Sequence, residues 1–251
     1  MREKNVKIPR QAIILLAGSG SRLGDYTKTI PKCMVEIADK PLLIRLLDQL
    51  EKIGVEQAIL VVGYRAKVIK KIVGHSYGKL LINYVENKFW ETTNNIVSLN
   101  LAIDLLNSNF FLLEGDLFFL DGVLEKLSGE NFMAIDQLKE GMNGTVVSLN
   151  NNGFVKKIYL ENNPNRPEKH IKLFKTVNAY SMVYEIFKNE LAPRLQKLID
   201  NGMKNIYYEQ AFADAIDDGV VFLKGVKFNE SNWCEIDTEE DLLKAREIFN
   251  A

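Results

Sequence analysis

The segment Ala12–Ile37, AIILLAGSGSRLGDYTKTIPKCMVEI, constrains the fold of this chain most. It begins with an apolar run and passes directly into a glycine-rich loop. A short continuous apolar run that ends at glycine predicts a buried strand, here Ala12–Ala17. Glycines allow the backbone to approach a phosphate chain closely and to point N–H groups at it. We therefore expect a strand that opens onto a phosphate-binding loop.

Strands and helices alternate behind this loop. The segment 40–54 has one apolar helical face and is bounded by Pro41 and Gly54, which predicts a helix. Further predictions are strands at 57–64, 80–88 and 110–119, with helices at 66–73 and 92–106. This order predicts an α/β fold: a Rossmann-like, doubly wound, mostly parallel but mixed sheet with helices on both faces.

The pattern changes after Asp121. Two strands around a turn are predicted at 144–149 and 154–160, and later strands at 175–184 and 220–226. Helices are predicted at 186–202, 206–219 and, to close the chain, 238–249. The 251 residues suit a single domain, 1–251, made of a first half 1–121 and a second half 122–251 that includes the closing helix.

Composition limits the partners that the chain can have. The formal net charge is −1 and the isoelectric point about 6.2, so no overall basic field is present to bind nucleic acid. We see no signal peptide and no membrane span, and the two cysteines form no disulfide or metal-binding pattern. We therefore expect a cytoplasmic protein that holds anionic ligands in a local site.

The loop does not match the common phosphate-binding fingerprints. Gly18 and Gly20 give G-x-G, but Leu23 stands where a dinucleotide fingerprint needs its third glycine, and no G-K-[ST] of a P-loop is present. Arg22 and Lys32 add two positive charges. For the glycines alone, a strand-to-loop turn beside two surface cations is the simpler interpretation.

Acidic residues follow two predicted strands. Asp116 stands at the end of an apolar run, where open α/β sheets bind ligands, and Glu114 projects to the same face. A carboxylate there can hold Mg²⁺ or can be a solvated turn acid. Thr238 and Asp241 form a T-x-x-D pattern that predicts a helix cap, with Asp237 directly before it.

LLAGSGSRL followed by PKCMVEIADKPLL resembles the sugar-nucleotidyltransferase signature L-A-A-G-x-G-x-R-L…P-K, and more closely its phosphocholine cytidylyltransferase-like branch. VVGY, ETTNNIVSL, LLEGDLFF, KTVNAYS and WCEIDTEEDLLKA also match, in the family's order, so the resemblance covers most of the chain. One departure is Leu16, which replaces the first alanine of A-A-G beside the nucleoside.

The resemblance implies a nucleotide-diphosphosugar-transferase fold with a nucleotide-binding half and an acceptor-binding half. It implies Mg²⁺ held by Asp116 and Asp237, and catalytic roles for Arg22 and Lys32. One of Asn94 and Asn95 is expected to cap a helix while the other reads the base. The implied nucleotide-binding residues are Leu16, Ala17, Gly18, Ser19, Gly20, Thr93, Asn94 and Asn95.

The implied reaction joins CTP and phosphocholine to give CDP-choline and pyrophosphate, in a monomer or homodimer. Aromatic faces bind quaternary ammonium groups, so Tyr180 and Trp233, with Glu209 as counter-charge, are predicted to bind the acceptor. Trp90, Tyr207 and Tyr208 are further aromatic candidates. Two alternatives stay open: the same chemistry on a sugar 1-phosphate, aminoethylphosphonate or another small phosphorylated acceptor, and a non-catalytic nucleotide-binding regulatory protein.

Overall fold

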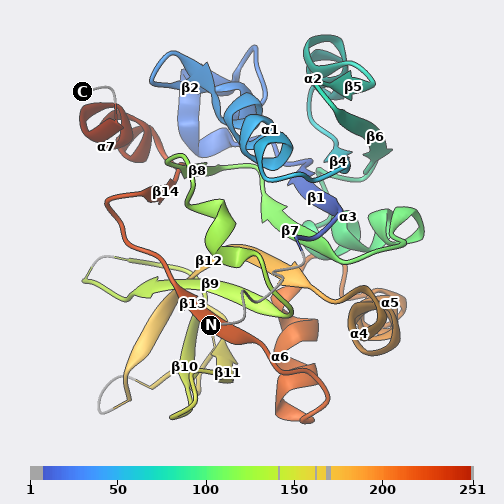
Figure 1. Ribbon diagram of the computed structural model, residues 1–251, viewed down its shortest axis with the longest axis vertical. Helices are drawn as coiled ribbons and strands as arrows, with labels where there is room; N and C mark the ends of the chain where they lie inside the picture. Colours follow the sequence, from blue (N-terminus) through green and yellow to red (C-terminus); the bar gives the residue numbers. More distant parts are fainter. Residues whose placement is uncertain (1–7, 141, 162, 168–170, 250–251) are drawn as a thin grey trace, which may run out of the picture.

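Four parallel strands form the centre of the computed structural model, which describes residues 8–140, 142–161, 163–167 and 171–249 (Figure 1). They are adjacent in the order β7–β1–β4–β6. Helices cover both faces of β1, β4 and β7, which are apolar and largely buried on both sides, whereas β6 alternates buried and more exposed positions. Their bounds are β1 Gln11–Leu16, β4 Gln57–Val62, β6 Leu80–Glu86 and β7 Phe110–Glu114.

Further strands extend this centre within the described residues, and all of them pair antiparallel except Lys224–Lys227, which runs parallel to its neighbour. The long strand β12 pairs with β7 on one side and with β10 and β9 further along, while β5 pairs with β6 at the opposite edge. The bounds are β5 Ser76–Tyr77, β9 Phe132–Gln137, β10 Val146–Leu149, β11 Val155–Tyr159, β12 Leu173–Met182 and β13 Lys224–Lys227. Two small antiparallel pairs lie outside it: β2 Glu36–Ile37 with β3 Lys40–Pro41, and β8 Leu117–Phe119 with β14 Trp233–Glu235.

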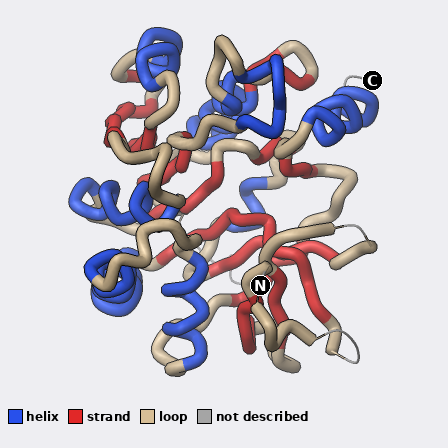
Figure 2. Tube along the Cα trace, turned by 180° about the vertical axis from the view of Figure 1, so that it is seen from behind, coloured by secondary structure: helices blue, strands red, loops and turns tan. Residues whose placement is uncertain are grey.

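Alternate side chains of β1 enter two separate cores. Ile14 packs in a core with Leu47 of α1, and Ile13 packs in another with Leu99 of α3. Figure 2 shows the helices around the strand layer from behind. The helices are α1 Leu42–Lys52, α2 Ala66–Val73, α3 Asn95–Ala102, α4 Tyr184–Ile186, α5 Ala192–Asp200 and α6 Glu209–Asp217. Among the helices of the described chain, none has the length and apolar character that crossing a bilayer requires.

The closing helix α7, Glu239–Phe249, returns to the first half of the chain and lies beside β2 (Figure 1). Its Leu242 packs in a third core with Leu23 and Ile37, and Arg246 Nε donates to the Glu36 carbonyl at 3.1 Å. This packing brings the segment before α7 next to the loop after β1. The main sheet also runs through both halves, and β8 of the first half pairs with β14 of the second, so the two halves are joined at three places.

The predicted fold class is confirmed, and two local predictions are wrong. The segment 110–119 is not one strand: β7 ends at Glu114, and β8 pairs with β14 in a different sheet. The polar connection after β1 is not extended, because it forms short 3₁₀ helices. The turns of this kind are η1 Ser21–Thr27, η2 Lys32–Met34, η3 Ile103–Leu105 and η4 Leu124–Leu127, with a π-helical turn η5 at Phe187–Leu191.

Gly63, directly after β4, allows two segments to meet. A Cβ there would lie 2.7 Å from the Ala17 carbonyl oxygen and 2.8 Å from Trp90 Cβ. We predict that Gly63→Ala lowers the free energy of unfolding by about 1–3 kcal/mol, because the backbone must shift to admit the methyl group. Urea denaturation followed by circular dichroism measures this change.

Gly18→Ala is the matched control for stability, since a Cβ at Gly18 would meet no described atom within 4 Å. Equal midpoints for both variants would contradict the close approach at Gly63.

Candidate active site

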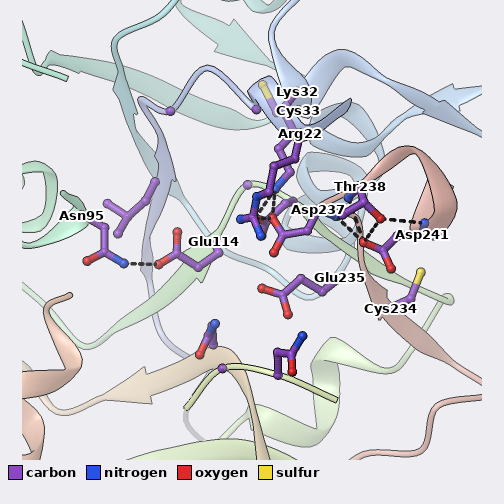
Figure 3. A pocket seen from close by; sticks show the side chains of 18 of the residues that line it. Arg22, Lys32, Cys33, Asn95, Glu114, Cys234, Glu235, Asp237, Thr238 and Asp241 are labelled. Atoms are coloured by element: carbon purple, nitrogen blue, oxygen red, sulfur yellow. Dashed lines mark hydrogen bonds and ion pairs between the residues drawn. The ribbon is translucent and has the colours of Figure 1, made fainter. Parts of the chain in front are cut away.

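A cavity of about 1210 Å³ opens at the carboxyl ends of β1 and β7, the position where open α/β sheets bind ligands (Figure 3). One wall is the loop after β1, and another is the segment that joins β14 to α7. The opposite side is formed by β12, α6 and the loops around Gly144 and Glu230. Of the predicted nucleotide-binding residues, Ser19 is not among those that line the cavity; Leu16, Ala17, Gly18, Gly20, Thr93, Asn94 and Asn95 line it.

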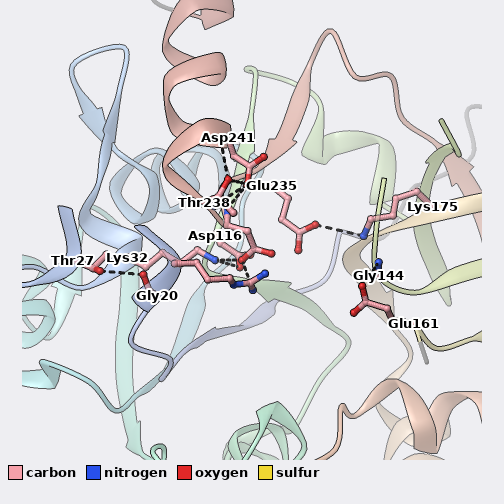
Figure 4. Close-up of polar contacts among 12 residues, drawn as sticks. Gly20, Thr27, Lys32, Asp116, Gly144, Glu161, Lys175, Glu235, Thr238 and Asp241 are labelled. Carbon is pink, nitrogen blue, oxygen red and sulfur yellow. Dashed lines mark hydrogen bonds and ion pairs between the residues drawn. The ribbon is translucent and has the colours of Figure 1, made fainter. Parts of the chain in front are cut away.

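The glycine loop has a shape that requires glycine at one position. Gly20 has φ +65°, and a Cβ there would lie 2.7 Å from Lys32 Cβ. Thr27 Oγ1 donates to the Gly20 carbonyl at 3.0 Å (Figure 4), and Tyr64 Oη donates to the Thr27 carbonyl at 2.8 Å. Gly18 instead faces open space in the cavity. The loop is therefore anchored at one end and open to a ligand at the other.

Lys32 joins two carboxylates that are far apart in the sequence. Its Nζ donates to Asp116 Oδ2 at 2.7 Å and to Asp237 Oδ1 at 2.5 Å, and Arg22 Nη2 lies 3.1 Å from Asp237 Oδ1 (Figures 3 and 4). Burial alone would lower the pKa of Lys32, but the two carboxylates outweigh it and hold that pKa above its ordinary value. Burial would raise the pKa of Asp237, yet Lys32 holds it below its usual range. Lys32 and Asp237 are therefore both charged at neutral pH.

The same acids can hold a hard cation. Carboxylate oxygens of Asp116, Glu235 and Asp237 all lie within 4.8 Å of one another. Asp116 Oδ1 is buried and has no hydrogen-bond partner among the described residues. Oxygen ligands of this kind suit Mg²⁺, so the residues present fit that ion. Glu235 ends β14, two residues before Asp237, and was not among the predicted site residues.

Lys175 on β12 is a further cation of the site, and it too was not predicted. Its side chain is 8% exposed, and Nζ lies 3.5 Å from Glu235 Oε2 (Figure 4). Burial raises the pKa of Glu235, and Lys175 opposes that rise. Lys175 belongs to the matched segment KTVNAYS, but an alternating strand pattern does not indicate which of its polar residues faces a cavity.

The structure assigns the helix cap to Asn94. Asn94 is the N-cap of α3, and its side-chain oxygen accepts from the Asn95 amide at 2.8 Å. Asn95 Nδ2 donates to Glu114 Oε1 at 3.1 Å, and Asn95 Oδ1 accepts from the Tyr208 amide at 2.9 Å (Figure 3). Asn95 therefore ties α3 to β7 and to the start of α6. Thr93 Oγ1 donates to the Phe89 carbonyl at 2.8 Å and so closes the turn before the cap.

The predicted cap at Thr238 is present. The Asp241 amide donates to Thr238 Oγ1 at 3.1 Å, and Asp241 Oδ2 accepts from the Thr238 amide at 2.8 Å (Figure 3). Asp241 Oδ2 also accepts from the Asp237 amide at 3.1 Å. The cap thus fixes the backbone that carries Asp237.

The three predicted acceptor residues have different environments. Glu209 and Trp233 line the cavity, and Trp233 Nε1 donates to Asp136 Oδ2 at 2.7 Å. Tyr180 does not line it and is fully buried, so the expectation that it contacts the acceptor is corrected. Its ring packs against Tyr208 and Phe212, because this part of β12 lies in the core covered by α6.

Comparison with known proteins agrees with this geometry. The family model of the MobA-like NTP transferase domain matches residues 12–213. The chain is 30% identical over 241 residues to the CMP-5'-(3-aminopropyl)phosphonate synthase of Streptomyces rubellomurinus, which covers 95% of this chain and 38% of that protein. It is 30% identical over 239 residues to the bifunctional protein GlmU of Methanococcus vannielii, and the match covers 95% of this chain and 54% of that protein. The chain therefore spans about half or less of the length of these curated relatives.

Solved structures share the fold over almost their whole length. The CTP:phosphocholine cytidylyltransferase LicC of Streptococcus pneumoniae superposes with a TM-score of 0.78 at 22% identity, covering 96% of this chain and 99% of that one. The inositol-1-phosphate CTP transferase of T. maritima gives a TM-score of 0.73 at 25% identity, and the superposition covers 96% of this chain and 94% of that one.

Proposed function

The chain belongs to the MobA-like NTP transferase family, and on this premise we propose that it is a cytidylyltransferase that transfers CMP from CTP to a small phosphorylated acceptor and releases pyrophosphate. Family membership supports nucleotidyl transfer in general. The order of matched motifs supports cytidine as the nucleoside, as do the CMP and CTP in the names of the Streptomyces, Streptococcus and T. maritima proteins.

One observation carries this proposal: Lys32 stands between Asp116 and Asp237 at the open end of the glycine loop. A site that only binds a nucleotide does not need a buried cation held by two acids. A site that moves a phosphoryl group does, because its chemistry is almost entirely positioning and charge stabilisation.

The proposed reaction is an in-line displacement. An oxygen of the acceptor's phosphate attacks the α-phosphorus; the new P–O bond forms as the bond to the bridging oxygen breaks, and its electron pair leaves with pyrophosphate. Backbone N–H groups at Gly18 and Gly20 face the triphosphate. Arg22 and Lys32 offset the developing negative charge. No general base is required, since a phosphomonoester is mostly dianionic at neutral pH.

Asp116 and Asp237, together with Glu235, would hold Mg²⁺, which when bound would neutralise part of the triphosphate charge. Lys32 keeps the carboxylates of Asp116 and Asp237 close together, which their mutual repulsion would otherwise oppose. The capping bonds of Thr238 fix the start of α7, so Asp237 is held from its own side as well.

The cavity supports an acceptor that carries a positive charge. Glu114 and Glu209 line it, and an ionised acid there attracts a cation and repels further anions. Phosphocholine, which the sequence resemblance favours, belongs to this class, and so do aminoalkylphosphonates. A sugar 1-phosphate carries no positive charge to complement these acids.

Pyrophosphate release tests the proposal when measured over CTP, UTP, ATP and GTP, each combined with phosphocholine, 2-aminoethylphosphonate and glucose 1-phosphate. We expect release that requires CTP, a divalent cation and one of the two cationic acceptors. Turnover confined to glucose 1-phosphate would contradict the proposed acceptor class. No release from any combination would contradict the proposed reaction.

Asp116→Asn removes one charge of the proposed metal site without changing the shape of the side chain. We predict that it lowers kcat at least about a hundredfold, as loss of a charge-stabilising group at a reacting centre does, and weakens Mn²⁺ binding measured by calorimetry. Asp121→Asn is the matched control, because Asp121 is exposed and does not line the cavity. Near-normal turnover of Asp116→Asn would refute the metal assignment.

Lys32→Met keeps the length of the side chain and removes its charge. We predict a fall in kcat of about a hundredfold or more with a smaller change in CTP affinity, because the charge acts mainly on the transferring group. Stopped-flow and equilibrium binding separate the two effects. Lys28→Met, at a surface lysine paired with Asp25, serves as the control. An effect limited to CTP affinity would argue against a role in the chemical step.

A further inference from the structure

Two carboxylate oxygens of the described residues are buried without a hydrogen-bond partner: Asp116 Oδ1 and Glu209 Oε2. The first belongs to the proposed metal site. The second has so far been given only a general role, as an acid that attracts the cation of the acceptor. Glu209 is the first residue of α6, is 3% exposed and lines the cavity. A buried carboxylate oxygen without a partner is unfavourable in the free protein, and a donor supplied by a ligand would satisfy it.

Several other acids of the cavity have partners among the described residues. Glu235 faces Lys175 at 3.5 Å, Glu114 accepts from Asn95 at 3.1 Å, and Glu230 pairs with Lys139. Asp237 is held by Lys32 and Arg22. Glu209 therefore keeps acceptor capacity that these acids have used within the protein.

The electrostatics at Glu209 also favour a cationic ligand. Burial raises the pKa of its carboxyl to about 7, with a further rise from Glu235, against a lowering by its own backbone hydrogen bond, by Lys175 and by the Asn95 side chain. The position at the start of α6 favours a negative charge, because the first turn of a helix presents unpaired N–H groups. A cation with N–H donors would complete the ionisation of this carboxyl and pair with it.

Aromatic side chains of the cavity are held in separate places. Trp90 packs edge-on against Tyr64, and Phe249 packs against Phe118. Trp233 is 5% exposed with its indole N–H bound to Asp136. These three rings come from distant segments, and each packs within its own surroundings, while Tyr207, the fourth ring that lines the cavity, is 45% exposed. A cage for a quaternary ammonium instead requires several ring faces turned toward one point.

Resting on the proposed function, we propose that Glu209 binds a primary ammonium group of the acceptor, so that the substrate class is an aminoalkyl phosphate or phosphonate. An –NH₃⁺ group donates three hydrogen bonds and can satisfy Glu209 Oε2 directly. A trimethylammonium group carries the same charge but has no N–H to donate. The cavity thus selects by hydrogen bonding, where a choline site selects by aromatic contact.

The test compares acceptors that differ at nitrogen alone. kcat/KM is measured with saturating CTP for phosphoethanolamine and phosphocholine, which differ by three N-methyl groups, and for 2-aminoethylphosphonate and ethylphosphonate, which differ by the amine. We expect each primary amine to exceed its partner at least about tenfold, since a charge-assisted hydrogen bond is lost with the N–H donors. Phosphocholine turned over as well as phosphoethanolamine would overturn the inference and leave the proposed function standing. No turnover with any acceptor would overturn the proposed function itself.

The variant Glu209→Gln tests the residue. We expect kcat/KM for phosphoethanolamine to fall at least about tenfold, with phosphocholine turnover and the KM for CTP changed less than about threefold. Glu230→Gln is the matched control, a cavity-lining acid whose partner is Lys139, and it should leave the preference between the two acceptors intact. Equal losses for both acceptors in Glu209→Gln would indicate a structural role and overturn the assignment; the wild-type comparison decides the acceptor class independently of this variant's stability.

Discussion

The contact of one ammonium group with two carboxylates organises this molecule. Lys32 comes from the connection after β1, Asp116 from the turn after β7, and Asp237 from the segment before α7. Two ionised carboxylates repel each other strongly where the local dielectric constant is low, and a cation between them offsets that repulsion. The position of Lys32 therefore requires the end of the chain to return to its beginning, and the core formed by Leu242, Leu23 and Ile37 provides that return.

Burial of such a cluster has a cost that packing alone would avoid. Charges removed from water lose hydration, and an apolar cluster of similar volume is often equally stable or more stable. The chain nevertheless fixes each member from a separate direction: Gly20 leaves room for the stem of Lys32, and the cap of Thr238 and Asp241 holds Asp237. A cluster that acts on a ligand would explain why this cost of burial is kept. The open space beside Gly18 agrees with such a ligand.

Local patterns in the sequence predict the parts of the fold that local forces decide. The apolar run of β1, the amphipathic face of α1 and the cap at Thr238 are all readable from residues close in the chain. The break between β7 and β8 could not be predicted in this way, because FFLLEGDLFF has the composition of one strand. The separation depends on pairing with β14, which comes more than a hundred residues later. Pairing of distant segments is a tertiary property that propensity does not record.

The same distinction applies to the site. Lys32, Asp116 and Asp237 stood in matched motifs and are brought together, whereas Glu235 and Lys175 gained their place only from the way β14 and β12 face each other across the cavity. The prediction for Tyr180 was wrong for the corresponding reason. A tyrosine near a motif can contact a ligand or pack in a core, and the side of β12 on which it lies decides between the two.

Two carboxylate oxygens that line the cavity are buried without a hydrogen-bond partner among the described residues. Asp116 Oδ1 lies in the cluster that Lys32 organises, and Glu209 Oε2 lies at the start of α6. An unsatisfied acceptor raises the free energy of the unliganded protein, and a ligand that supplies the missing partner recovers that free energy on binding. A substrate with a phosphate at one end and a cation at the other can approach both regions at once, its phosphate toward the cationic loop and its charge toward Glu209. Selection between acceptors then depends on whether the cation brings N–H donors for Glu209. This selectivity comes from Glu209 and not from the nucleotidyl-transfer chemistry that the family shares.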